Sequence, residues 1–177
     1  YANAAMALQY SWKKKAEGDS KGSLRWRPFQ LGFILLAAES SCNPHSQERD
    51  VLDLLWFPTG GGKTEAYLAI IGMLAWYRRL SHDNPDDGAG NAALMRYTLR
   101  PLTAQQFERA SSLILACELI RRGREFPRKG KPSIGNRPFS IGLWVGMDAT
   151  PNTFNDAVNG KDRSSAEQIP LCPCCNR

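Results

Sequence analysis

The chain has 177 residues, a net charge of +6 and a pI near 9.2, with 42% hydrophobic and 23% charged residues. These values exclude a disordered or fibrous protein and indicate a globular domain or an incomplete part of a larger one. The longest apolar runs fall short of the roughly 20 residues that a membrane helix needs, so we expect no membrane contact. The positive charge favours polyanionic partners, although charge alone mainly affects solubility and weak association.

The chain opens with Tyr1 and Ala2 and lacks the basic, apolar and small-residue order of a secretory signal. We expect its natural start to lie upstream. Its five cysteines are an odd number, and three of them crowd the C-terminal end, which does not fit the disulfide framework of a small secreted domain. A reducing, cytoplasmic location is the simpler expectation.

The first part of the chain is expected to be helical. Tyr1 to Glu17 reads as a helix and Gly18 to Ser23 as a linker, so residues 1–24 form an N-terminal helix and linker. Pro28 suits the first position of a second helix, in which Phe29 to Glu39 is apolar enough to be buried on most of its surface. A polar loop closes that helix.

Strands and helices are then expected to alternate. Short apolar runs bounded by loops predict three buried strands, and two helical patterns lie between them. This order predicts an α/β fold with a doubly wound parallel sheet. The expected strands are Val51–Phe57, Ala92–Thr98 and Phe139–Val145, and the expected helices are Glu65–Leu80 and one that begins at Thr103 and places Phe107, Ala110, Ile114 and Cys117 on one face.

The strongest chemical signal is the Gly-rich segment from Phe57 to Thr64, between a predicted strand and a predicted helix. Its glycines let backbone N–H groups converge on phosphate oxygens, and the helix N-terminus adds partial positive charge. Lys63 would reach the β- and γ-phosphates, and Thr64 would join the Mg²⁺ shell, so both are candidate catalytic residues. The predicted ATP-binding residues of this segment are Thr59, Gly60, Gly61, Gly62, Lys63, Thr64 and Glu65.

One residue departs from the general phosphate-loop pattern, GxxxxGK(S/T). Phe57 stands where that pattern has its first glycine. The alternative interpretation is a Gly-rich turn beside a chance Lys-Thr pair, and the strand before and helix after it argue against that interpretation.

Pro58 to Glu65 resembles motif I of superfamily 2 helicases, a family that does not require the first glycine. Arg27 to Gln30 resembles the RPxQ element ahead of motif I, and the resemblance implies that Gln30 reads the adenine edge. A residue at a helix start that faces solvent is the open alternative for Gln30. The family implies a RecA-like P-loop NTPase fold, of which residues 25–150 would be an incomplete first motor part.

The segment Thr98 to Gln106 resembles motif Ia, which implies contact with the backbone of DNA or RNA. Arg100 beside a helix N-terminus is a plausible phosphate site on physical grounds as well. Thr103 and Gln106, which also form a capping box, complete that interface. The segment Ile141 to Asn152 resembles motif Ib, with Gly146 as its nucleic-acid residue.

Together these segments, from about Arg27 to Asn152, resemble the helicase component (DrmA) of bacterial DISARM phage-defence systems. That resemblance implies a cytoplasmic bacterial protein that acts on invading DNA beside other DISARM components. The acidic residues that position water and the arginine finger are missing from the sequence, so this chain alone should hydrolyse ATP poorly.

Two alternatives from other classes stay open. One is a recombination or AAA-type P-loop NTPase in which Asp148 is the Walker B acid, although Ala149 follows where an acidic residue would orient water. The other is a DNA-binding module without enzymatic activity, whose Gly-rich loop holds backbone phosphates.

The C-terminal part, residues 151–177, reads as a polar insertion that leads into half of a zinc ribbon. Cys172 and Cys175 have the spacing of one zinc knuckle, but tetrahedral zinc needs four ligands and no second pair follows. Zinc binding by these cysteines and a set of free thiols are equally open interpretations. A basic loop, Arg121 to Arg137, offers a further salt-sensitive contact for nucleic acid, with a solvated loop as its alternative.

Overall fold

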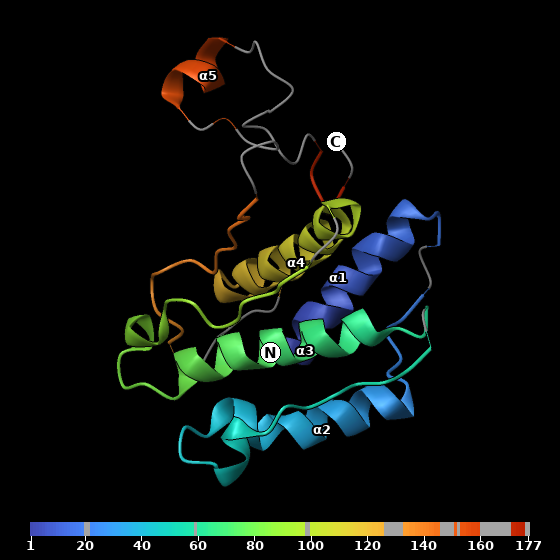
Figure 1. Cartoon of the computed structure of the whole chain (residues 1–177), viewed down its shortest axis with the longest axis vertical. Helices are drawn as coiled ribbons and strands as arrows, with labels where there is room; N and C mark the ends of the chain where they lie inside the picture. Colours follow the sequence, from blue (N-terminus) through green and yellow to red (C-terminus); the bar gives the residue numbers. More distant parts are fainter. Residues whose placement is uncertain are drawn as a thin grey trace.

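The computed structural model contains helices joined by long loops (Figure 1). It describes residues 1–19, 22–58, 60–97, 100–125, 133–145, 151, 153–159 and 171–175, with the backbone alone for 100–103. The α-helices are α1 (Ala2–Ala16), α2 (Pro28–Cys42), α3 (Lys63–Leu80), α4 (Arg100–Arg121) and α5 (Phe154–Asn159), and two short 3-10 helices are η1 (Gln47–Asp50) and η2 (Pro85–Gly88).

Helix α3 lies at the centre of the helical part. It packs against α2 on one side and against α1 and α4 on the other, and α1 also packs on α4 (Figure 1). The N-terminal ends of α2, α3 and α4 all lie toward the right of that view. Among the described helices, none is long and apolar enough to cross a membrane.

The apolar core lies where α1, α3 and α4 meet. Met6, Leu68, Leu113 and Ile120 are its largest fully buried side chains from these helices. Small neighbours let the helices approach closely: a Cβ at Gly72 of α3 would already contact the methyl groups of Leu113 at 3.7 Å. The alanines of this core are Ala5, Ala69, Ala110 and Ala116.

The predicted core face of α4 is confirmed in part. Ala110 and Cys117 are buried, while Phe107 and Ile114 are only half-buried. Burial raises the pKa of the Cys117 thiol to about 12, so this thiol stays protonated at neutral pH.

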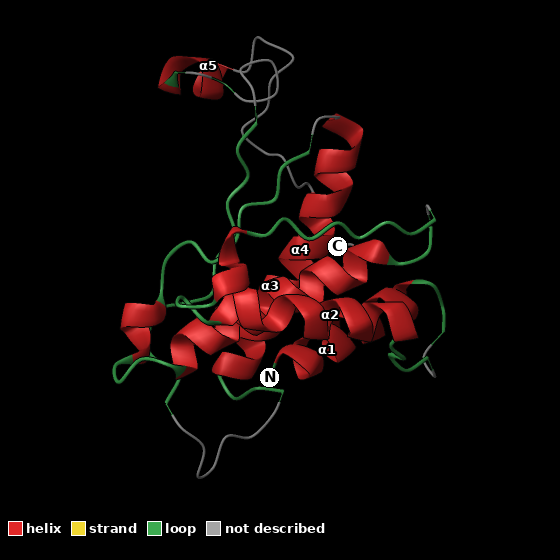
Figure 2. Cartoon of the chain, turned by 60° about the horizontal axis from the view of Figure 1, so that its bottom comes forward, coloured by secondary structure: helices red, strands yellow, loops and turns green. Residues whose placement is uncertain are grey.

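The prediction of a doubly wound parallel sheet is wrong. No strand occurs among the described residues, and Figure 2 shows only helices and loops there. Val51–Phe57, Phe139–Val145 and the described part of Ala92–Thr98 are all irregular. A buried strand needs neighbours that pair with its backbone and cover both faces, but here α3 packs directly on other helices.

The side chains of the first predicted strand illustrate this difference. Leu52, Leu54 and Trp56 are 91%, 80% and 90% exposed, so this apolar run is not a core element of the described structure. An apolar run of this length fits a buried strand only where neighbouring strands supply hydrogen bonds.

Two expectations for the helices also need correction. Helix α2 is buried only at Gln30 and Ala37, while Leu35 and Leu36 are 74% and 61% exposed, because among the α-helices α2 packs only on α3. Helix α4 begins at Arg100, so Thr103 lies inside its first turn and not at the capping position that we predicted.

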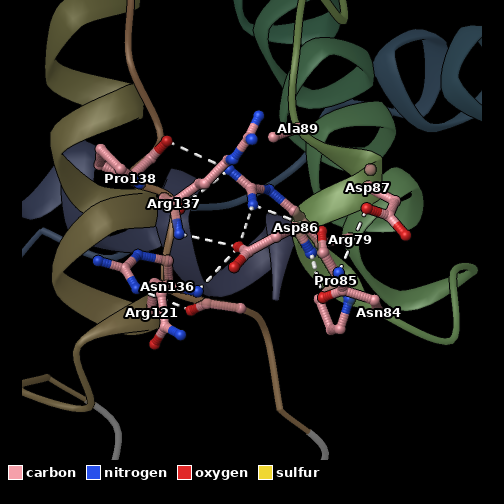
Figure 3. Close-up of polar contacts among 12 residues, drawn as sticks. Arg79, Asn84, Pro85, Asp86, Asp87, Ala89, Arg121, Asn136, Arg137 and Pro138 are labelled. Carbon is pink, nitrogen blue, oxygen red and sulfur yellow. Dashed lines mark hydrogen bonds and ion pairs between the residues drawn. The ribbon is translucent and has the colours of Figure 1, made fainter.

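A buried arginine joins the end of α3 to two loops (Figure 3). Arg79 is only 3% exposed, and its guanidinium lies 3.2 Å from the Asp86 carboxylate. It also donates to the carbonyl oxygens of Arg137 and Pro138 at 3.0 and 3.2 Å. The same Asp86 oxygen accepts from the backbone N–H groups of Asn136 and Arg137, both at 2.8 Å, which lowers the pKa of Asp86. These bonds fix residues 136–138 against η2.

A second polar cluster holds the same loop to the end of α4. Burial disfavours the charged form of Glu118, but hydrogen bonds from Arg121, Arg122 and the backbone N–H of Phe139 outweigh it. The net effect lowers the pKa of Glu118 from 4.5 to about 2. Arg121 also donates to the carbonyl oxygen of Gly135 at 2.9 Å.

Candidate phosphate site

The Gly-rich loop is the connection between an extended segment and α3. Thr59 lies outside the described residues, and the loop continues through Gly60 to Gly62. The N–H of Gly61 donates to the carbonyl oxygen of Pro58 at 3.1 Å, which forms a tight turn. Gly60 and Gly62 have φ angles of 78° and 92°, the left-handed region that glycine adopts without strain. The predicted order of loop and helix is therefore present without the predicted strand.

Lys63 and Thr64 are the first two residues of α3. Within the part of the chain that the structure describes, no side chain caps this helix end, so first-turn N–H groups keep their capacity to donate. The Lys63 ammonium folds back and donates to the carbonyl oxygen of Phe57. A cation, a helix N-terminus and a glycine turn thus meet at one place, a combination suited to an anion.

Helix α2 supports the loop through its N-terminal turn. The Arg27 guanidinium donates to the carbonyl oxygen of Gly61, and the Gln30 amide donates to that of Gly62, both at 2.8 Å. The rings of Phe29 and Phe57 stack with centroids 3.8 Å apart. Three side chains at the start of α2 therefore contact the loop and hold it in place.

The glycines are required by these close contacts. A Cβ at Gly61 would lie 2.9 Å from both the Phe57 ring and the Pro58 carbonyl oxygen. A Cβ at Gly62 would lie 2.8 Å from the Gln30 amide nitrogen. A side chain at Gly61 would therefore force the loop to move, and one at Gly62 would displace the Gln30 amide and strain the backbone at its φ of 92°.

An ion pair connects the phosphate loop with α4. Glu65, in the first turn of α3, pairs with Arg109, and the two side chains are only 28% and 30% exposed. The second carboxylate oxygen of Glu65 would lie 3.4 Å from a Cβ at Gly62, so the acid borders the loop directly. Gln9 of α1 donates to the carbonyl oxygen of Arg109 at 2.5 Å and adds a third helix to this connection.

The predicted nucleic-acid residues are described only in part. Arg100 and Thr103 lie in the first turn of α4, whose side chains are outside the described residues, and so are Gly146 and the alternative acid Asp148. The Gln106 side-chain oxygen is buried and has no hydrogen-bond partner among the described residues. The helix N-terminus expected here is present, but the contact itself stays a prediction.

The basic loop contributes less free positive charge than its composition suggests. Arg121 and Arg122 both pair with Glu118, and the Arg137 backbone joins the contacts of Asp86. Arg128, Lys129 and Lys131 lie outside the described residues. Two of the described cations of this loop, Arg121 and Arg122, are thus engaged in holding it to α4.

The C-terminal cysteines form a small turn on α4. Ser112 donates to the carbonyl oxygen of Pro173 at 2.9 Å, and backbone N–H groups of Cys174 and Cys175 lower the pKa of Cys172. Burial raises the pKa of Cys174 to about 12. No group of three or more metal-ligating side chains occurs among the described residues, so the zinc assignment to Cys172 and Cys175 stays a prediction.

An open depression of about 450 Å³ lies between α2, α3 and the extended segment before α4. Its polar side includes Arg96 and Tyr97, and the rings of Phe33 and Tyr67 meet edge to face at 5.8 Å inside it. Sequence reasoning did not find this depression, because its walls come from three separate segments.

Sequence reasoning also missed the roles of Arg27 and Arg109. Arg27 stands three residues before Gln30 at a helix start, the spacing of a capping box, and this spacing could have indicated that the two act together. Arg109 and Glu65 are 44 residues apart, and no local pattern joins them.

Comparison with known proteins relates the chain to a phage-defence protein. No known protein-family profile matches the chain. The chain is 44% identical over 170 residues to the DISARM protein DrmA of Bacillus paralicheniformis (strain ATCC 9945a / NCIMB 11709 / CD-2), an alignment that covers 88% of this chain. The chain spans only 14% of the length of that protein. The similarity supports a relationship with DrmA and leaves the superfamily 2 assignment untested.

Proposed function

We propose that this chain carries the ATP-phosphate site of a nucleic-acid-dependent ATPase, of the helicase or translocase type, that acts on DNA in bacterial anti-phage defence. The observation that carries the ATP site is the meeting of Lys63, the uncapped start of α3 and a glycine loop supported by Arg27 and Gln30. The similarity to DrmA supports the defence role and makes other DISARM components the expected partners.

Within this proposal each group has a defined task. The loop N–H groups and Lys63 would bind the phosphate oxygens of ATP, and Thr64 would hold Mg²⁺ beside them. Magnesium would supply charge neutralisation at the phosphates, while the residues of this chain bind and orient them. The start of α4 would contact the backbone of the nucleic acid.

The test is the rate of ATP hydrolysis by the full-length protein, measured with and without single-stranded DNA, double-stranded DNA and RNA. We expect turnover that DNA increases. Turnover unaffected by any nucleic acid would favour an unrelated NTPase, and DNA binding without ATP binding would favour a module without enzymatic activity. Either result would overturn the proposal.

A further inference from the structure

The amide of Gln30 has both of its ends engaged inside the protein. Its oxygen accepts from the backbone N–H of Arg27 and its nitrogen donates to the carbonyl oxygen of Gly62, each at 2.8 Å. These partners fix the orientation of the amide, because an N–H group can only donate and a carbonyl oxygen can only accept. The first bond completes a capping box at the start of α2.

Gln30 is also closed off from solvent. The residue is only 4% exposed, and the glycine loop lies against it so closely that a Cβ at Gly62 would be 2.8 Å from the amide nitrogen. A base edge would need a donor and an acceptor from the same amide at once. The amide keeps one N–H and one lone pair, but its burial leaves them unexposed to a ligand.

We infer that Gln30 is a positioning residue of the phosphate loop, and that the site recognises the triphosphate group of nucleoside triphosphates without selecting adenine through Gln30. This inference rests on the proposed function. Gln30 acts through Gly62, the residue that precedes α3, and so fixes where the first N–H groups of α3 point. Arg27 does the same one residue earlier, through Gly61.

The two roles of Gln30 predict different losses of ligand affinity when Gln30 is substituted. Substitution of a residue that reads the base lowers the affinity for ATP and leaves the affinity for a ligand without a base unchanged. Substitution of a residue that positions the loop lowers the affinity for every ligand that carries the triphosphate, by the same factor. Inorganic tripolyphosphate, which has no base, therefore separates the two roles.

The experiment is calorimetric titration of the full-length protein with Mg-ATP, Mg-GTP and Mg-tripolyphosphate. In Gln30→Met, we expect the affinity for all three to fall by the same factor, roughly two- to tenfold, the value of one or two hydrogen bonds. Gln47→Met is the matched control, because Gln47 is exposed in η1, beyond the end of α2 that lies away from the loop, and it should leave all three affinities unchanged. Thermal unfolding of each variant separates loss of folding from loss of affinity.

Arg27→Lys keeps the inference testable if Gln30→Met does not fold. It keeps the positive charge but loses the geometry of the bond to Gly61, so it should also weaken all three ligands equally. A loss for ATP alone in Gln30→Met, or no loss for any ligand, would overturn the inference and leave the proposed function standing. A wild-type protein that binds none of the three ligands would overturn the proposed function itself, and the inference with it.

Discussion

Glu65 and Arg109 form an ion pair between the first turn of α3 and the middle of α4. The positive charge of Arg109 offsets the Glu65 carboxylate, which would otherwise repel an incoming phosphate at the adjacent loop. It is also the polar connection between the proposed ATP site and the helix whose start is proposed to contact nucleic acid. Both side chains are partly shielded from solvent, so the pair is less screened than a fully exposed one.

Arg109→Met should weaken ATP binding in the full-length protein by about two- to fivefold, because the carboxylate of Glu65 then faces the phosphates without its partner. Glu65→Gln combined with Arg109→Met should restore the affinity, since it removes the unpaired charge. Titration with Mg-ATP measures both. The surface pair Lys14–Glu17 provides the control, and Lys14→Met should have no effect. An equal loss in the single and double variants would argue against the electrostatic role.

Gly62→Ala should damage the phosphate site, whereas Gly32→Ala should not. At Gly62 the φ of 92° adds roughly 1–2 kcal/mol of strain, and the new Cβ would collide with the Gln30 amide. At Gly32, inside α2, a Cβ meets nothing within 4 Å, and alanine should stabilise the helix by about 0.5–1 kcal/mol. Thermal unfolding and ATP titration of both variants check this contrast. Normal ATP affinity in Gly62→Ala would show that the loop is not held as described.

Removing the buried arginine should destabilise the fold without touching the phosphate site. Arg79→Met removes the guanidinium beside Asp86, which keeps its backbone N–H donors, and leaves the carbonyl oxygens of Arg137 and Pro138 without this buried donor, at a cost of about 1–3 kcal/mol. Arg49, which is exposed and donates to the carbonyl oxygen of Ser40, is the control, and Arg49→Met should change stability little. Denaturant unfolding measures both. Similar stability in the two variants would contradict this role of Arg79.

Glu118 should make stability dependent on pH in the acid range. Its pKa is about 2 in the folded protein and 4.5 as an ordinary carboxyl, so between these values the unfolded state binds more protons. Stability from Glu118 is therefore complete above pH 4.5 and falls as pH is lowered toward 2, by roughly 2–3 kcal/mol in total. Glu118→Gln should flatten the curve of unfolding free energy against pH over this interval. A curve as steep as that of the wild type would contradict the assignment.

The sequence predicted the helices and the phosphate loop better than the fold. Helical periodicity and local signals located α1, α2, α3 and most of α4, and the glycine run with Lys63 located the candidate site. These features depend on residues that are close in the chain. The three strands failed because a short apolar run does not determine its own partners, and Leu52 and Trp56 are exposed.

The contacts that shape the site were not predictable from local patterns. Gln30 and Gly62 are 32 residues apart, and Arg79 and Arg137 are 58 residues apart. Such pairs follow from the packing of α2 and α4 on α3, which the sequence alone does not give. The resemblance placed Gln30 near the nucleotide but did not indicate that both ends of its amide would be used within the protein.

The most direct test of the account is ATP hydrolysis by the full-length protein with Lys63 replaced by alanine. Lys63→Ala should reduce DNA-stimulated turnover to background and leave the circular dichroism and thermal unfolding unchanged, because the Lys63 side chain is a donor to the loop and not part of the core. Lys15→Ala, at the exposed end of α1, is the matched control and should retain full turnover. Unchanged turnover in Lys63→Ala would contradict the assignment of this loop as the ATP-phosphate site.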